Sequence, residues 1–242
     1  MVKGAPLDKQ CPNAALHQRG APQNYHPIKH ADFLRLLCDQ LKTSLDDGVT
    51  KLGLEGSQGV LFQVTLLAYG YTFVSKGTVA AFIPNLEHEA AVYKHLEQMQ
   101  GTAVPIFLGD VDLRNMGKVY YDDLRVYIEY MLFLSWGGNT IDSSASVGKV
   151  LGCLRSIHEK GVVHGDVRRA NVLFDPRTGR VMVVDFERAS IVKPARSPLG
   201  QVVPNKRPWD HGRNMEKNMG RPHSSLVGFQ DDILAVNAAF SQ

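Results

Sequence analysis

Apolar residues recur at helical spacing shortly after the start of the chain. From Lys29 onward, the chain carries an apolar series with polar residues between its members: Phe33, Leu34, Leu36, Leu37, Leu41 and Leu45. This period predicts an amphipathic helix that ends near Gly48, and we expect its apolar side to pack against the rest of the protein. Residues 1–28 are rich in Pro, Gly, Asn, Gln and His and show little periodicity, so we expect a loosely ordered arm there.

Further along the chain, short apolar runs separated by glycine-containing turns predict strands. The expected strands are 50–54, 60–67, 71–79, 104–109 and 124–132, and later 161–163, 172–174 and 181–184. Residues 86–99 and 143–160 have a helical period and predict helices. The last apolar stretch, 229–240, opens with Asp231 and Asp232, acidic residues that suit a helix N-terminus.

Composition narrows the class of protein. Of 242 residues, 44% are hydrophobic and 21% are charged, which is ordinary for a soluble globular protein. The net charge of +3 is mild and the basic residues are dispersed, which disfavours nucleic-acid binding. The three cysteines lack metal-ligand spacing, and no apolar run is long enough to cross a membrane. We therefore expect an intracellular protein, cytoplasmic or nuclear, with reduced thiols.

Three polar residues follow strands in the segment 158–188. The predicted strands and turns deliver Asp166, Asn171 and Asp185 to one edge of a small sheet. Phosphoryl transfer from a nucleotide needs such a set: one carboxylate to accept or steer a hydroxyl proton, and an amide oxygen and a second carboxylate to hold magnesium. Each residue alone would more often be a turn residue or a cap, but their combination and order favour the chemical interpretation.

This segment resembles the catalytic elements of protein kinases. His164-Gly165-Asp166 followed by Asn171 resembles the H-R-D-x-x-x-x-N loop, and Asp185-Phe186-Glu187 resembles the D-F-G element. The resemblance implies an α+β, two-lobed fold, with an antiparallel N-lobe sheet, one helix of the αC type and a mainly helical, shortened C-lobe. The lobes would be residues 29–135, including the N-terminal helix, and residues 136–242, including a basic tail.

The resemblance also implies roles for residues around the predicted loop. Asp166 would be the catalytic base or steering group, and Asn171 and Asp185 would hold Mg²⁺. Arg168 would neutralise charge on the transferring phosphoryl group. His164 would brace the loop through a ring N–H, whereas His158 is expected to be structural and Arg169 to lie on the surface.

The nucleotide would be held by residues from the first half of the chain. Gly56, Ser57 and Gly59 resemble part of the kinase glycine-rich loop, although a plain turn explains them equally well. Lys76, one hairpin later, would hold the α- and β-phosphates of ATP. Its partner would be Glu89, with Glu87 as the alternative because the two glutamates face different sides of a helix.

The stretch from Glu129 to Leu132 resembles the kinase hinge. Backbone groups there, at Glu129 and Met131, would pair with the adenine edge. Gly137 and Gly138 would mark the break between the lobes.

Several stretches resemble one more specific family of kinase-like proteins, and other positions depart from the kinase pattern. Those from Gly70-Tyr71-Thr72 to Asp185-Phe186-Glu187-Arg188-Ala189 resemble a fungal-type protein kinase-like family, and the H-G-D form is similar to aminoglycoside phosphotransferases. Gly165 replaces an arginine, Glu187 replaces the glycine of D-F-G, and no A-P-E element follows. Control by loop phosphorylation is therefore not expected, and the short stretch after Asp185 puts a peptide-binding platform in doubt.

The sequence supports one main hypothesis for function and leaves alternatives open. The main hypothesis is an ATP- and Mg²⁺-dependent phosphotransferase that acts on Ser or Thr hydroxyls of a protein. The alternatives are a small-molecule kinase of the aminoglycoside phosphotransferase type and a nucleotide-binding pseudokinase scaffold. A partner-binding module that uses the basic tail has less support.

Overall fold

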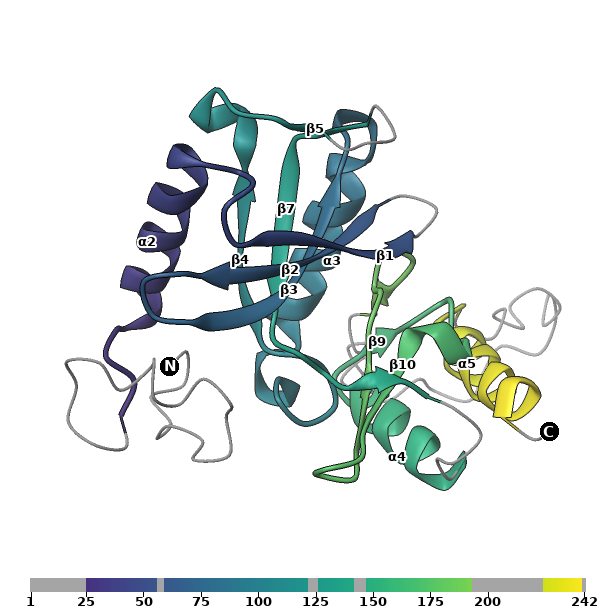
Figure 1. The fold of residues 1–242 in the computed structure, drawn as a ribbon. Helices are drawn as coiled ribbons and strands as arrows, with labels where there is room; N and C mark the ends of the chain where they lie inside the picture. The colour runs from purple at the N-terminus through teal and green to yellow at the C-terminus, as the bar shows by residue number, and fades with distance from the viewer. Residues whose placement is uncertain (1–24, 56–58, 122–125, 142–146, 193–223, 241–242) are drawn as a thin grey trace, which may run out of the picture.

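The computed structural model describes residues 25–55, 59–121, 126–141, 147–192 and 224–240. Its largest element is an antiparallel sheet of five strands in the order β1-β2-β3-β7-β4. The strands are β1 (Val49–Glu55), β2 (Val60–Leu66), β3 (Tyr71–Thr78), β4 (Phe107–Asp112) and β7 (Tyr130–Leu134). We call the part of the chain up to β7 the N-lobe (Figure 1).

Two helices lie against this sheet, one on each face. Helix α2 (His30–Thr43) buries Phe33, Leu37 and Leu41, so the amphipathic helix predicted after Lys29 is confirmed, although it ends before Gly48. Helix α3 (Ile83–His95) lies across the sheet from α2 (Figure 1). The side chains of β7 show that the two helices cover opposite faces of the sheet. Met131 and Phe133 pack in the cluster that contains α2, whereas Tyr130, Leu132 and Leu134 pack in the cluster that contains α3.

Short elements connect the strands of the N-lobe. They are three 3₁₀ turns, η1 (Ala80–Phe82), η2 (Glu97–Met99) and η3 (Leu113–Met116), and the two-stranded ribbon of β5 (Tyr120–Tyr121) and β6 (Tyr127–Ile128). The run predicted as one strand over 124–132 is therefore two strands, β6 and β7. The strand predicted at 104–109 lies three residues further along, as β4.

The remainder is called the C-lobe, and its described residues form two helices and several short strands. The helices are α4 (Val147–His158) and α5 (Ser224–Phe240). Strands β8 (Asn139–Thr140), β10 (Val172–Asp175) and β11 (Arg180–Val183) form one sheet, β9 (Val162–Val163) pairs with β12 (Ser190–Ile191), and η4 (Arg169–Asn171) precedes β10. The predicted two-lobed α+β fold is confirmed. No helix in the described parts of the chain is long and apolar enough to span a membrane.

The position of α5 corrects one expectation. Asp231 and Asp232 were expected to open this helix, but it begins at Ser224, so both lie well inside it. Asp232 is buried, with 3% of its surface exposed. A carboxylate at this depth needs hydrogen-bond donors, and the C-lobe supplies them, as described below.

The packing between the lobes is continuous. One cluster of buried residues contains Leu86 and Tyr93 of α3 together with Ile157 of α4, Val162 of β9 and Phe186. Helix α3 therefore shares its apolar environment with the C-lobe rather than with α2. This arrangement places the polar residues of α3 at the junction of the lobes.

Candidate active site

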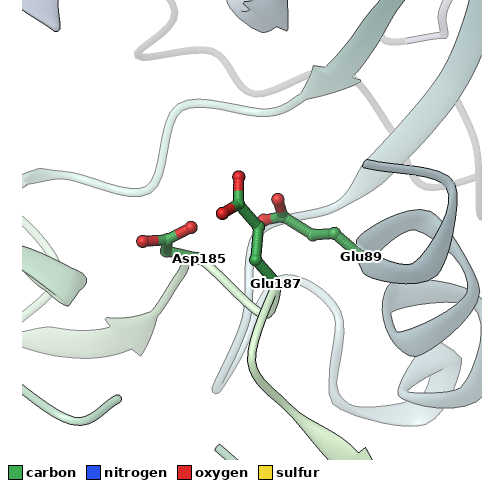
Figure 2. Close-up of side chains that lie close together, drawn as sticks. All are labelled: Glu89, Asp185 and Glu187. Carbon is green, nitrogen blue, oxygen red and sulfur yellow. The ribbon is translucent and has the colours of Figure 1, made fainter. Parts of the chain in front are cut away.

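A lysine of the N-lobe meets three carboxylates at the junction of the lobes. Nζ of Lys76 lies 2.9 Å from Oε2 of Glu89, 2.7 Å from Oδ1 of Asp185 and 2.7 Å from Oε1 of Glu187. Figure 2 shows the three carboxylates converging, one from α3 and two from the segment after β11. The structure thus brings together Lys76, Glu89 and Asp185, which the sequence singled out, and adds Glu187. Glu87 is exposed and does not join this group.

The position of Lys76 within β3 directs its side chain toward the three carboxylates. Along β3 the side chains alternate between the faces of the sheet, and Ser75 and Gly77 on either side of Lys76 are buried on the opposite face. Gly59 lies next to the stem of Lys76, and a Cβ there would come within 2.9 Å of the Gly77 carbonyl oxygen. Glycine at position 59 therefore allows the chain just before β2 to lie close to β3. Gly56 and Ser57 lie outside the described residues.

The charges in this cluster are strongly coupled. Burial would lower the pKa of Lys76, but the carboxylates of Glu89, Asp185 and Glu187 outweigh it and hold that pKa above its ordinary value. Burial raises the pKa of Glu89, and the lysine charge opposes this effect. Glu89 also accepts a hydrogen bond from the backbone N–H of Phe186 at 3.3 Å through Oε1. The lysine ammonium is therefore fixed as a cation between the lobes.

The backbone at Asp185 has an unusual conformation. Its φ is +70°, and among the described residues it is the one non-glycine residue in the left-handed region. Such a conformation costs on the order of 1 kcal/mol for a residue with a side chain. The surrounding contacts maintain it, and the side chain points at Lys76.

The loop before β10 places a second group of polar residues near Asp185. Nε of Arg168 lies 3.3 Å from Oδ2 of Asp166, and its Nη2 lies 3.7 Å from Oδ2 of Asp185. Nδ2 of Asn171 donates to the backbone oxygen of Asp166 at 2.9 Å and to its Oδ2 at 3.4 Å. Asp166, Arg168, Asn171 and Asp185 are therefore brought together, and the Asn171 amide oxygen is left to act as an acceptor.

A buried histidine braces this loop. Nδ1 of His164 accepts from the backbone N–H of Asp166 at 3.2 Å, so Nε2 carries the proton and donates to the carbonyl oxygen of Val184 at 3.0 Å. Burial lowers the pKa of His164, which favours this neutral form. The next residue, Gly165, has φ +76°, and a Cβ there would lie 2.7 Å from the carbonyl oxygen of Arg188. The loop therefore needs glycine where many kinases have arginine.

Asp232 of α5 anchors the same loop, a role that the sequence did not reveal. Its Oδ2 accepts from the backbone N–H of His164 at 2.7 Å and from Nε2 of His158 at 2.9 Å, and its Oδ1 accepts from the N–H of Gly165 at 2.9 Å. Burial would raise the pKa of Asp232, but these donors lower it overall. The only sequence signal was an acidic residue within an apolar stretch.

Arg169, expected at the surface, is partly buried and also connects the loop to α5. Its Nε donates to the carbonyl oxygen of Ala239 at 2.6 Å, and its guanidinium lies 5.5 Å from the ring centre of Phe240. The arginine thus hydrogen-bonds a carbonyl in the last turn of the helix, where a positive charge is favourable.

A series of aromatic rings crosses the junction of the lobes. The ring centres of Phe107 and Tyr93 are 6.4 Å apart, those of Tyr93 and Phe186 are 5.2 Å apart, and those of Phe186 and His164 are 4.9 Å apart. The series links β4, α3, the segment after β11 and the polar loop. It fixes the position of Phe186, and hence of the carboxylates on either side of it.

The residues expected to contact adenine do not lie at a free backbone edge. The N–H of Glu129 donates to the carbonyl oxygen of Thr78 at 2.9 Å, and its own carbonyl oxygen accepts from the N–H of Leu113 at 2.8 Å. Met131 is fully buried within β7 and pairs with strands on both sides. These backbone groups already bond to neighbouring strands and turns, which leaves them poorly placed to pair with the edge of a base, so the geometry disagrees with this expectation. The chain leaves the sheet only after Leu134.

The oxygen atoms of this site suit a hard divalent cation. Ligand oxygens of Glu89, Asp185 and Glu187 lie within 4.8 Å of one another. All three carboxylates contact Lys76 through one oxygen. Glu89 is also fully buried and accepts the Phe186 N–H through its other oxygen, so the second oxygens of Asp185 and Glu187 are better placed to bind an ion, with the amide oxygen of Asn171 in the nearby loop. Carboxylate and amide oxygens are the ligands that magnesium prefers, so the residues present fit this ion.

Comparisons with known proteins agree with this geometry. Residues 149–195 match the phosphotransferase enzyme family. The described fold is similar to the crystal structure of an Stt7 homologue from Micromonas algae soaked with ATP, with a TM-score of 0.50, 21% identity, and coverage of 62% of this chain and 52% of that one. The chain has a protein-kinase-like fold.

Two curated proteins are similar to this kinase-like chain in sequence. The meiotic driver SPOK2 of Podospora anserina is 37% identical over 201 residues, which is 81% of this chain and 25% of that protein. The mitogen-activated protein kinase kinase kinase YODA of Arabidopsis thaliana is 33% identical over 88 residues, 32% of this chain and 10% of that protein. The chain thus spans about a quarter and a tenth of the lengths of these relatives.

Proposed function

We propose that the chain is an ATP-dependent phosphotransferase whose acceptor is a Ser or Thr hydroxyl of a protein. The observation that carries this proposal is the Lys76 ammonium, held between Glu89 and Asp185 and beside the loop that contains Asp166. A lysine fixed in this way can bind phosphate oxygens without further ordering. The kinase-like fold and the match to a phosphotransferase family support the same activity.

The proposed magnesium ligands lie on the C-lobe side of Lys76. Asp185 would hold Mg²⁺ together with Asn171 and Glu187, and the bound ion would neutralise the charge of the ATP phosphates. Glu89, Asp185 and Glu187 contribute three carboxylates, against the ammonium of Lys76 and the guanidinium of Arg168, which lies 3.7 Å from Asp185. The carboxylates thus outnumber the cations next to them, and this excess attracts a metal cation.

The loop residues would act on the acceptor hydroxyl and on the transferred group. Asp166 would accept or steer the hydroxyl proton, and Asn171 holds its carboxylate in place at 3.4 Å. Arg168 bridges Asp166 and Asp185 and is more than half exposed, so its guanidinium can reach phosphate oxygens at the mouth of the site.

The remaining roles follow the arrangement of the lobes. We place the adenine contacts at the backbone of residues 135–138, directly after β7, and the phosphate contacts of the glycine turn at Gly56, Ser57 and Gly59. We also place the boundary between lobes 29–135 and 136–242 in this connection, because β7 belongs to the N-lobe sheet and β8 pairs with β10.

The test is transfer of labelled phosphate from ATP to protein extract and to small-molecule alcohols. Asp166→Asn is expected to lower turnover by about 10²–10⁴-fold and to leave ATP binding nearly unchanged, because it removes the proton acceptor only. Lys76→Ala is expected to weaken binding and turnover together. Asp39→Asn on the exposed side of α2 is the matched control. Unchanged turnover in Asp166→Asn would refute the assignment.

A second candidate is a kinase for a small-molecule alcohol, which the phosphotransferase match over residues 149–195 favours. It would show transfer to alcohols such as aminoglycosides and none to proteins. Binding of ATP without transfer to either class of acceptor would instead indicate a pseudokinase.

A further inference from the structure

Two histidines tie α3 to the C-lobe and take no part in the proposed chemistry. Nε2 of His88 lies 2.8 Å from the carbonyl oxygen of Ala189, and Nε2 of His95 lies 2.8 Å from the carbonyl oxygen of Lys160. A carbonyl oxygen only accepts hydrogen bonds, so each imidazole donates through Nε2. The histidines are seven residues apart, about two helical turns, and therefore lie on the same side of α3.

The two carbonyl groups belong to different parts of the C-lobe. Ala189 comes two residues after Glu187, in the segment that carries the proposed metal ligands, whereas Lys160 lies in the turn between α4 and β9. Nζ of Lys160 donates to Oε1 of Gln98 at 2.7 Å, so the same turn also contacts η2, the 3₁₀ turn that follows α3. Helix α3 is thus held near its middle and at its end.

The orientation of α3 decides whether Glu89 reaches Lys76. Lys76 lies on β3, whose Phe73 packs in the cluster that contains α2, whereas Glu89 lies on α3, which packs with the C-lobe. The ion pair at 2.9 Å joins these two packed units. Rotation of α3 away from the C-lobe would withdraw Glu89 from the lysine and its oxygen from the Phe186 N–H.

We propose that His88 and His95 are positioning residues that keep α3 in the orientation in which Glu89 holds Lys76. Both histidines bond to backbone carbonyl oxygens, at Ala189 and Lys160. The contacts that position α3 therefore involve no charged acceptor in the C-lobe. The effect on turnover rests on the proposed function, whereas the effect on α3 itself does not.

The test compares His88→Ala, His95→Ala and the double variant with the parent chain. We expect faster hydrogen exchange of α3 amides and greater reaction of Lys76 with an amine-specific reagent, both followed by mass spectrometry. In the double variant the KM for ATP should rise about fivefold or more, as expected for two hydrogen bonds lost from the binding-competent state. His88→Gln should restore parent behaviour because Gln presents an Nε2 donor at similar reach, and His88→Asn should not.

His30→Ala is the matched control, because His30 Nε2 makes the same kind of bond to the Leu108 carbonyl oxygen at 2.7 Å but lies on α2. It should leave Lys76 labelling unchanged. Parent-like α3 exchange and Lys76 labelling in the double variant would overturn the inference. If both rise as expected while even the parent chain neither binds nor turns over ATP, the inference about α3 stands and the proposed function is wrong.

Discussion

At the scale of single residues, two acidic groups that support the site, Glu89 and Asp232, are buried and hydrogen-bonded. Asp232 shows this most clearly, because one carboxylate accepts two backbone N–H groups of the polar loop and one imidazole. Neutral acceptors would satisfy the same donors less strongly, since hydrogen bonds to a charged group contribute more to stability. The shape of the loop around Asp166 therefore depends on the charge of a residue in another element.

Asp232→Asn should lower the free energy of unfolding by about 1.5–3 kcal/mol at neutral pH, because charge-assisted bonds become neutral ones. The pKa of Asp232 lies below its ordinary value of 3.8 in the folded chain, so its contribution is full above that value and is lost as the pH falls through the folded pKa. The difference between parent and variant should therefore narrow below about pH 4. Urea unfolding at several pH values measures it, and a difference independent of pH would contradict the assignment.

At the scale of elements, the periodic segments were predictable and their ends were not. Helices α2 and α4 and the first three strands have strong apolar periods, and local sequence was sufficient for them. Helix α3 has a weaker apolar period, and its predicted range of 86–99 lies three to four residues further along the chain than the observed Ile83–His95. The break between β6 and β7 depends on bonds from Glu129 to Thr78 and Leu113, which are distant in sequence. Lys76, Glu89, Asp166 and Asp185 were predictable because they fall in stretches that resemble kinase motifs. Asp232 was not, because its role depends on contacts with residues distant in sequence, such as Gly165, 67 residues away.

Helix α2 supports the face of the sheet away from the candidate site. Leu37 is fully buried there, so Leu37→Ala should lower the free energy of unfolding by about 2–5 kcal/mol through lost burial and a residual cavity. The folded variant should bind ATP as the parent does, because α2 contacts none of the proposed ligands. Chemical unfolding and ATP titration measure the two effects. Leu36→Ala, at a partly buried position, should cost less, and an equal cost would argue against this packing.

At the scale of the whole molecule, one apolar cluster belongs to both lobes. Leu86 and Tyr93 of α3, Leu132 of β7 and Val183 of β11 pack in it together. The lobes therefore share part of their stabilising surface, and a ligand at the junction contacts residues from both. Unfolding of one lobe would expose the apolar surface of the other.

We therefore expect one cooperative thermal transition that shifts upward with ATP and magnesium. Ligand binding at 100 times Kd adds about 2.7 kcal/mol to the free energy of unfolding. Removal of magnesium with a chelator should abolish most of this shift, because Asp185 and Glu187 would then repel the phosphates. Calorimetry tests the first point and a thermal-shift titration tests the second. Two separate transitions, or a shift insensitive to chelator, would contradict these expectations.

The left-handed backbone at Asp185, with φ +70°, is a strained conformation at a residue that the proposed reaction needs. Glycine adopts this conformation without strain, so Asp185→Gly would relax the chain locally. It would also remove the ion pair between Asp185 and Lys76 at 2.7 Å, so relief of strain and loss of this pair act on stability in opposite directions. The strained residue at this position is therefore held in place by the same lysine that the proposed reaction uses, and a glycine there would release both the backbone and the proposed metal ligand.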